Sequence, residues 1–362
     1  MEHIYIAGPE CFYSGGYEQW NAMRRMAEAS GAGVTLPNDA ELNLSHDDLR
    51  KNADEIFRNC AHSMNRSTAI IADLEFFRGP EMDGGTAYEI GMAYARGLRC
   101  YGYTRDRRSM VWKYQYTRLK DGAAYDRKGR RLPYAELPFP PDIVGSTKIV
   151  EGRFEDCLRI MLADVEEEKK QEALGVSVCR DRLPQKAAAN FSRPVVFLAG
   201  PERYENGAAE VYSKMKDLCT AHGLEPVTPL DFAPGITAVR NPEDPLISAC
   251  RQFKNNCAHV VNCDAVVANL NDFHGWEPDG DTSFECGMAF QLGKKLFGYR
   301  DSVVRMRDRV PNLGPEREYR DERGCNVENF DYPCNLMFSS SMPILEGGFE
   351  AVIPQIARVL CR

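Results

Sequence analysis

Residues 4–10 read IYIAGPE, and residues 196–202 repeat them as VFLAGPE, so that Gly8 corresponds to Gly200, 192 residues further along the chain. A second stretch, AIIADL at 69–74, returns as AVVANL at 265–270 with an offset of 196 residues. The loop and helix over 79–91 recur at 275–287, and Gly152-Arg153-Phe154 matches residues 347–349. A near-constant offset over most of each half predicts a duplicated domain and not a short-period solenoid.

Each half reads as alternating strands and helices. In the first half short apolar runs predict strands at 3–7, 34–36, 67–72 and 99–103, and helical patterns occupy 17–30, 46–64, 86–96 and 154–165. This alternation predicts an α/β fold. We expect two tandem, doubly wound parallel sheets of the flavodoxin or Rossmann type, which form a pseudo-dimer within one chain.

The predicted domains are residues 1–172 and 194–362, joined by a linker over 173–193. Residues 104–150 are interpreted as a long, irregular, Arg-rich insertion. Most of it should be solvated surface, although a loop of this length can also close over a site.

Composition narrows the class of protein. The 362 residues carry a formal charge of −8, with 43% hydrophobic and 27% charged residues, which is ordinary for a soluble globular protein of two domains. No apolar run is long enough to span a membrane, and the first strand begins too early to leave room for a signal peptide. The acidity disfavours nucleic-acid binding. Thirteen cysteines without a CxxC pair indicate reduced thiols and a cytoplasmic location.

Candidate site residues follow the predicted strands. In an open parallel sheet, ligands bind beyond the carboxyl ends of the strands. Gly8 and Pro9 follow the first strand, Asp73 ends the third, and the loop 81–86 opens the next helix. We therefore expect Asp73, Asp83 and Glu89 to share one cleft with the hydroxyl group of Tyr5.

Simpler interpretations of these residues remain open. Thr86 and Glu89 have the spacing of a capping box, as have Thr282 and Glu285 in the second half. The number of acidic residues nevertheless exceeds what one helix cap requires. Three carboxylates could also hold magnesium, but no phosphate-binding motif accompanies them, and Gly8-Pro9 lacks the GxGxxG spacing.

Taken together, the motifs resemble the nucleoside 2-deoxyribosyltransferase family, and its protozoan-type members most closely. The resemblance rests on IYIAGP at 4–9, ADL at 72–74, FRG at 77–79 and DGGTAYEIG at 83–91, and RDRRSM at 105–110 extends it. It covers most of residues 3–165 and, more loosely, residues 195–360.

The resemblance implies an enzyme that cleaves the N-glycosidic bond of a 2′-deoxynucleoside and passes the sugar to another nucleobase. Glu89 would be the nucleophile that attacks C1′, and Tyr5 would direct it through a hydrogen bond. Asp73 would protonate the leaving base and deprotonate the incoming one. Asp83 would hold a sugar hydroxyl and repel a phosphate. The further substrate-binding residues implied are Gly8, Pro9, Phe77, Arg78, Gly79, Asn335 and Met337.

The two halves differ at the positions that carry this chemistry. Family members take an asparagine from a partner subunit in an Asn-Leu-Met motif, and residues 335–337 supply that motif here, whereas the first half has Pro140 in place of Asn335. The second half has Phe197 for Tyr5 and Asn269 for Asp73. An amide cannot cycle a proton as a carboxylic acid can. We expect one working site per chain, completed by Asn335, and a degenerate site around Glu285.

The expected partners are deoxynucleosides and free nucleobases, with no metal or other cofactor, in nucleoside salvage. Chains of this kind could also assemble as a homo-oligomer of pseudo-dimers. Two alternatives remain. One is an N-glycoside hydrolase of the same fold, in which water replaces the second base. The other is a nucleoside-binding sensor without catalysis, against which the intact Tyr5, Asp73 and Glu89 speak.

Overall fold

The structure is a computed structural model, and it describes residues 1–39, 41–114, 117–120, 123–127, 129–174, 183–186, 192–233, 236 and 244–361. Of the linker predicted over 173–193, residues 175–182 and 187–191 lie outside the described part of the chain. Within the described ranges, no helix combines the length and the apolar character that crossing a membrane requires.

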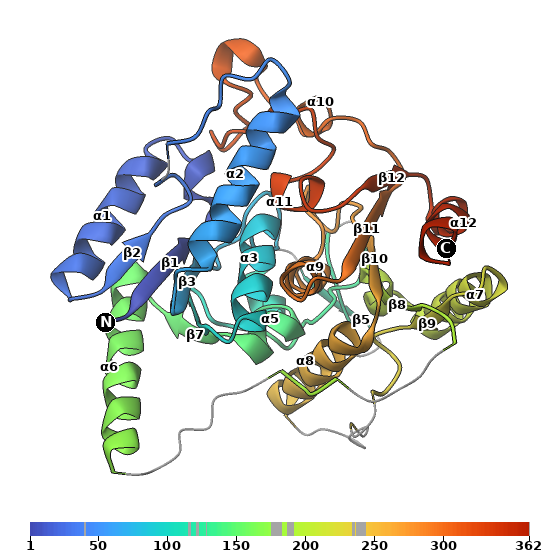
Figure 1. Cartoon of the computed structure of the whole chain (residues 1–362), viewed down its shortest axis with the longest axis horizontal. Coiled ribbons are helices and arrows are strands. Elements are labelled where there is room, and N and C mark those ends of the chain that lie inside the picture. Colours follow the sequence, from blue (N-terminus) through green and yellow to red (C-terminus); the bar gives the residue numbers. More distant parts are fainter. Residues whose placement is uncertain are drawn as a thin grey trace.

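Two parallel five-stranded sheets form the two lobes of the molecule (Figure 1). The first lobe orders its strands β2-β1-β3-β4-β7, with bounds β1 His3–Ala7, β2 Gly33–Thr35, β3 Ala69–Asp73, β4 Arg99–Thr104 and β7 Lys148–Glu151. The second lobe repeats this order as β9-β8-β10-β11-β12, with bounds β8 Val195–Ala199, β9 Glu225–Val227, β10 Ala265–Asn269, β11 Lys295–Arg300 and β12 Ile344–Glu346. This is the flavodoxin-like order, and the predicted fold class and duplication are confirmed.

Helices cover both faces of each sheet, as parallel strands require. The four long helices of the first lobe are α1 Gly16–Ala29, α2 Leu49–Met64, α3 Gly84–Ala95 and α6 Phe154–Ala173. Their counterparts in the second lobe are α7 Ala208–Ala221, α8 Pro245–Asn262, α9 Gly280–Gln291 and α12 Phe349–Leu360. The outer face of the first sheet packs Ile4 and Ile6 against Trp20 of α1 and Met161 of α6.

The inner faces of the two sheets share one hydrophobic core that runs through both lobes. Helices α3 and α9 cross at its centre, and a glycine of each helix meets the backbone of the other. A Cβ at Gly91 would lie 2.1 Å from the carbonyl oxygen of Phe284, and a Cβ at Gly287 would lie 1.9 Å from that of Tyr88. Only glycine permits this approach, so the lobes are held as one compact pair.

Short helices are exchanged between the lobes. Helix α5 (Pro141–Ser146) of the first lobe packs on α8 and α9, and α11 (Leu336–Ser339) of the second packs on α2 and α3, as Figure 1 shows. Pro140 and Asn335 are the N-cap residues of these two helices. Each lobe therefore brings a helix terminus to the other lobe's sheet at equivalent positions.

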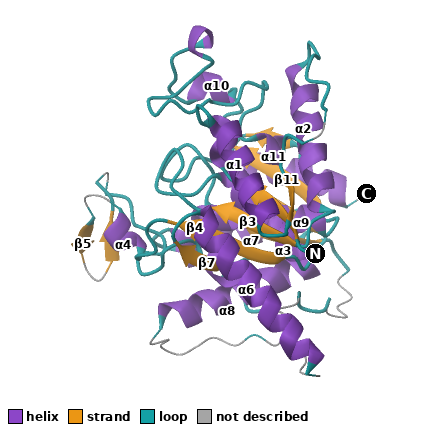
Figure 2. Ribbon diagram, turned by 90° about the vertical axis from the view of Figure 1, so that its left-hand side faces the viewer, coloured by secondary structure: helices purple, strands orange, loops and turns teal. Residues whose placement is uncertain are grey.

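The prediction that 104–150 is an irregular insertion was wrong in part. This segment contains α4 (Met110–Lys113), the hairpin of β5 (Arg118–Lys120) and β6 (Ala123–Tyr125), helix α5, and most of β7. The hairpin projects from the body of the molecule beside α4 (Figure 2). Strand β7 has four residues with Lys148 and Glu151 at its ends, and it lies at the sheet edge, so it lacks the apolar run typical of a central strand. Short helices at Pro9–Phe12, Pro201–Tyr204, Met306–Arg309 and Pro315–Arg317 complete the described fold.

Candidate active site

The start of helix α3 differs from the capping-box interpretation. The N-cap residue is Asp83, whose Oδ2 accepts hydrogen bonds from the backbone nitrogen of Thr86 (2.7 Å) and from its hydroxyl group (2.8 Å). Helix α3 thus begins three residues earlier than a Thr86 cap would require, and Asp279 caps α9 in the same way. The capping role predicted as an alternative for Glu89 is therefore wrong, and Glu89 lies in the second turn.

Glu89 accepts a hydrogen bond from the hydroxyl group of Tyr5, which comes from the neighbouring strand β1. Both side chains are buried, and burial, together with the charges of Asp83 and Glu10, raises the pKa of Glu89 to about 8. The hydrogen bond from Tyr5 opposes this rise because it stabilises the carboxylate. Burial raises the pKa of Tyr5 well above its usual value, so its hydroxyl remains a donor.

A cavity of about 670 Å³ opens in front of Glu89, between the lobes. The first lobe contributes Gly8, Asp83 and Glu89, and the second lobe contributes Asn335 and Met337. Apolar and aromatic side chains form much of the remaining wall, among them Phe12, Tyr17, Trp20, Leu42, Leu44, Ile56, Tyr319 and Phe330. The volume and the mixture of apolar walls with a few polar groups are typical of a small-molecule site.

Asp83 offers an unused acceptor to this cavity. Its Oδ2 is engaged by Thr86, but its Oδ1 is buried without a hydrogen-bond partner in the described part of the chain. A buried carboxylate oxygen is rarely left unsatisfied in a native protein. The arrangement suits a ligand hydroxyl that donates to Asp83.

Asn335 reaches the site from the opposite lobe. Its Oδ1 caps α11 by accepting from the backbone nitrogen of Met337 at 2.9 Å. A Cβ at Gly85 would lie 2.8 Å from Asn335 Nδ2, so the amide group sits directly against the first turn of α3. Glu328, which sequence reasoning missed, also lines the cavity and positions this terminus by accepting from the backbone nitrogen of Leu336 at 2.8 Å.

Asp73 lies behind Gly8 and is not among the residues that line the cavity. Its neighbour is Glu10, another buried carboxyl group that sequence reasoning missed. A Cβ at Gly8 would lie 2.1 Å from Glu10 Oε2 and 3.0 Å from the Cβ of Asp73. Burial raises the pKa of Asp73 to about 6 and, with the charge of Asp73, that of Glu10 to about 8. Both carboxyl groups are therefore protonated more easily than free ones, although Glu10 also accepts hydrogen bonds from Trp20 Nε1 at 3.2 Å and from the hydroxyl group of Tyr103 at 3.1 Å.

In the second lobe the equivalent pair consists of a glutamate and an asparagine, because Asn269 replaces Asp73. There Asn269 Nδ2 donates to Glu202 Oε1 at 2.7 Å. Asn269 and Glu202 occupy the positions of Asp73 and Glu10 in the repeat. An amide can donate its own hydrogen to the glutamate, whereas a carboxyl group at this position can donate only when it is protonated.

The remaining predicted substrate-binding residues lie around the cavity and not in its lining. Pro9 begins the short helix Pro9–Phe12, and Phe77 stacks on the cavity residue Phe12 with ring centroids 5.2 Å apart. Arg78 forms buried ion pairs across the lobes, with Glu277 at 3.4 Å and Asp321 at 3.3 Å. Gly79 meets the second lobe as well, because its Cβ would lie 2.8 Å from the Cα of Gly275. These residues therefore support the cavity wall or the contact between the lobes and do not line the cavity.

The equivalent site of the second lobe is closed by an ion pair. Arg203 binds both oxygens of Glu285, at 2.8 and 2.6 Å, and these side chains are 4% and 1% exposed. In the repeat Arg203 takes the place of Cys11, and Asp281 takes the place of Gly85. Asp281 also accepts a hydrogen bond from the hydroxyl group of Tyr204. Aligning the two halves position by position reveals both differences.

The chain belongs to the nucleoside 2-deoxyribosyltransferase family. The sequence model of that family matches residues 4–150 and again residues 196–337, once in each lobe. The resemblance and the tandem duplication expected from the sequence are thereby confirmed.

Two solved structures are similar to parts of the chain. The 2-desoxiribosyltransferase from Leishmania mexicana is 26% identical with a TM-score of 0.36, over 46% of this chain and 97% of that one. A conserved protein from Enterococcus faecalis V583 is 14% identical with a TM-score of 0.29, over 47% of this chain and 100% of that one. No curated protein matches the chain. Both structures correspond in length to about half of this chain.

Proposed function

We propose that the first lobe transfers the 2-deoxyribosyl group of a 2′-deoxynucleoside to another nucleobase, a reaction of nucleoside salvage. The observation that carries this proposal is the buried Glu89 at the cavity, held by the hydroxyl group of Tyr5. A carboxylate suits displacement at C1′ because the transition state is oxocarbenium-like, and a covalent ester divides one hard displacement into two.

In the first step the ionised carboxylate of Glu89 forms a bond to C1′ while the glycosidic bond breaks. The electron pair of that bond goes to the base nitrogen. We assign the proton to the Asp73–Glu10 pair, which lies behind the lining residue Gly8 and reaches the base past that glycine. In the second step a nitrogen of the incoming base attacks C1′, the ester to Glu89 breaks, and the proton returns to the pair. Tyr5 keeps the attacking oxygen directed at C1′ throughout.

The sugar is held between the two lobes. The free Oδ1 of Asp83 accepts a sugar hydroxyl, and the amide nitrogen of Asn335 donates to the same part of the ligand. A buried carboxyl group at this point disfavours a phosphate there, which favours nucleosides over nucleotides. The apolar wall then receives the base.

The test of this function is a base-exchange assay. The full chain is incubated with deoxyinosine and free adenine, and the products are separated. Deoxyadenosine is the expected product, and it should be absent with Glu89→Gln. Release of free deoxyribose without deoxyadenosine would establish the hydrolase instead, and the absence of both products would favour the sensor.

Asn335→Ala should weaken catalysis at Glu89, although the two residues belong to different lobes. Losing one hydrogen bond to the sugar costs about 1 kcal/mol, or up to about 3 if a buried partner is left unpaired, which corresponds to roughly 5-fold to 150-fold in kcat/KM. Asn335→Ser keeps a capping oxygen for Met337 and should lose a similar amount of activity with less loss of stability. An unchanged kcat/KM for Asn335→Ala would mean that the first lobe is self-sufficient.

The pH profile should report the carboxyl groups of the site. Glu89 must lose its proton to attack, so kcat/KM rises with pH towards about 8, and it falls again when the Asp73–Glu10 pair loses its last proton. In Glu10→Gln the amide donates to Asp73 and stabilises its carboxylate, which lowers the pKa of Asp73. Asp73 alone then sets the alkaline limb, which should move down by about two pH units or more, from about 8 to about 6 or below.

The matched control for this profile is Glu202→Gln, the same change at the equivalent position of the second lobe. It should leave both limbs where they are in the unsubstituted chain. An alkaline limb that does not move in Glu10→Gln would remove Glu10 from the proton transfer.

A further inference from the structure

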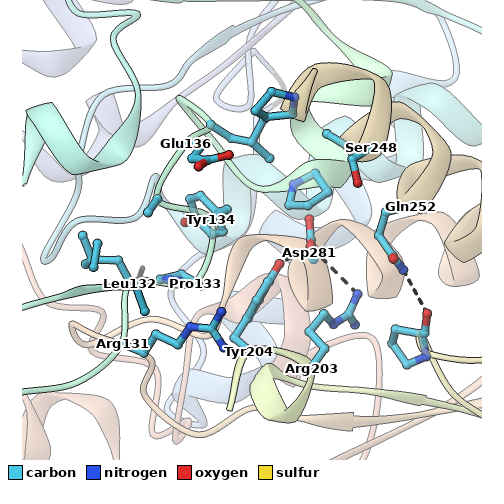
Figure 3. Close-up of a pocket in the computed structure, with 18 of the residues that line it drawn as sticks. Arg131, Leu132, Pro133, Tyr134, Glu136, Arg203, Tyr204, Ser248, Gln252 and Asp281 are labelled. Atoms are coloured by element: carbon cyan, nitrogen blue, oxygen red, sulfur yellow. Dashed lines mark hydrogen bonds and ion pairs between the residues drawn. The ribbon is translucent and has the colours of Figure 1, made fainter. Parts of the chain in front are cut away.

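The second lobe contains a cavity of about 500 Å³ of its own, shown in Figure 3. Arg203, Tyr204 and Asp281 lie at its floor, Ser248 and Gln252 reach it from α8, and the segment 131–137 forms the opposite wall. It occupies the place in the second lobe that the Glu89 cavity occupies in the first. The proposed reaction has no use for it.

Equivalent residues of the repeat line both cavities. Tyr204 takes the position of Phe12 and Pro229 that of Pro37, both at the offset of 192 residues. Gln252 takes the position of Ile56 at the offset of 196. In the first lobe these positions belong to the wall that the proposed function assigns to the base. The second lobe therefore keeps a cavity lined by the same positions of the repeat.

The part that would receive a sugar is filled instead. The carboxylate of Asp281 stands where Gly85 leaves room in the first lobe, and Arg203 seals Glu285 with two hydrogen bonds. Asp142 takes the position of Met337, and its backbone nitrogen donates to Asp281 Oδ1 at 2.8 Å. Pro140 in place of Asn335 offers no side-chain donor. The space beside Glu285 that a deoxyribose would need is therefore taken up by Asp281 and Arg203.

The charge and the walls of the remaining space select a neutral, flat ligand. The charge of Arg203 is balanced by Glu285 and by Asp281 at 3.9 Å, so the floor attracts neither anions nor cations strongly. Arg131 and Glu136 on the opposite wall add one charge of each sign, so the lining as a whole favours neither. The ring of Tyr204 is fixed by stacking on Phe273, with centroids 5.8 Å apart, and by its hydrogen bond to Asp281. The other walls are largely apolar or aromatic: Leu132, Pro133, Tyr134, Leu137, Pro141, Pro229, Leu230 and Ala249. Such walls suit a heteroaromatic ring.

We propose that this cavity binds a free nucleobase, without its sugar, and does not turn it over. The choice of a nucleobase among flat heterocycles rests on the function proposed for the first lobe. The chain would then hold two base-binding cavities, of which only the one at Glu89 also accepts a nucleoside.

The test counts binding sites on the full chain by equilibrium dialysis with free adenine. We expect two sites in the unsubstituted chain and one in Ser248→Trp, because Ser248 is an exposed residue of α8 at the cavity and the indole would fill the space. Ile247→Trp is the matched control, since Ile247 is an exposed neighbour outside the lining, and it should keep two sites. Retained base exchange in Ser248→Trp would show that the chain is folded and that its first cavity is intact.

A second arm uses Glu89→Gln, in which a nucleoside can bind without being consumed. Deoxyadenosine should occupy one site in this variant and free adenine two. If the unsubstituted chain binds one adenine and Ser248→Trp still binds one, the inference is overturned and the proposed function is unaffected. One adenine site that disappears in Ser248→Trp would support the second cavity and contradict base binding beside Glu89. Two sites for deoxyadenosine in Glu89→Gln would overturn the exclusion of the sugar.

Discussion

Glu89→Gln should reduce base exchange by several orders of magnitude while the chain stays folded. The substitution keeps the size of the side chain and an oxygen that can accept from Tyr5, but it removes the charge that we propose to attack C1′. Since Asp83 and not Glu89 belongs to the cap of α3, the helix start is untouched. The measurement is kcat/KM for deoxyadenosine formation, with folding verified by circular dichroism.

The equivalent change in the second lobe, Glu285→Gln, is the control. It should leave base exchange nearly unchanged, because Arg203 already occupies the carboxylate and Phe197 supplies no hydroxyl. Its effect should appear in stability, since a buried guanidinium loses one of its charged partners. Equal losses of activity in the two variants would mean two working sites and a wrong assignment of roles.

Arg78→Met should destabilise the chain by about 3–5 kcal/mol, the usual cost of leaving buried charges without their partner. Arg78 is 2% exposed in its side chain, and it pairs with Glu277 and Asp321 of the second lobe. Removing it strands two carboxyl groups at the contact between the lobes. The measurement is the free energy of unfolding from urea titration, with any intermediate reported by activity loss.

Arg105→Met is the control for this change, because Arg105 pairs with Glu75 at 3.2 Å but is 71% exposed. A surface pair of this kind contributes about 0–1 kcal/mol. If both substitutions cost the same, the interlobe ion pairs would be irrelevant to the stability of the pseudo-dimer.

The sequence predicts the fold well because the evidence for it is local and occurs twice. The buried strands β1 and β3 are apolar runs, and the near-constant offset shows that the second lobe must repeat the first. Strand β7 could not be predicted, since only Val150 is fully buried in it and hydrogen bonds to β4, distant in sequence, define it.

Only those site residues that follow a predicted strand or belong to a recognisable motif could be predicted from the sequence. The rule that ligands bind beyond the carboxyl ends of strands brings Tyr5, Asp83 and Glu89 together. Arg203 was visible as a difference between the repeats, but its bond to Glu285 depends on the fold. Glu328 carries no signal in the sequence, because only the packing of α11 against the first lobe brings it to the cavity.

The exchange of α5 and α11 between the lobes of one chain affects how the two sites can evolve. In an assembly of two identical subunits, every mutation of the gene enters both sites at once. Here each half of the gene encodes its own lobe. A change at one position, such as those that placed Pro140, Phe197 or Asn269 in this chain, therefore alters one site and spares the other. Natural selection for one reaction can therefore preserve one copy of each paired position, while the other copy is free to change.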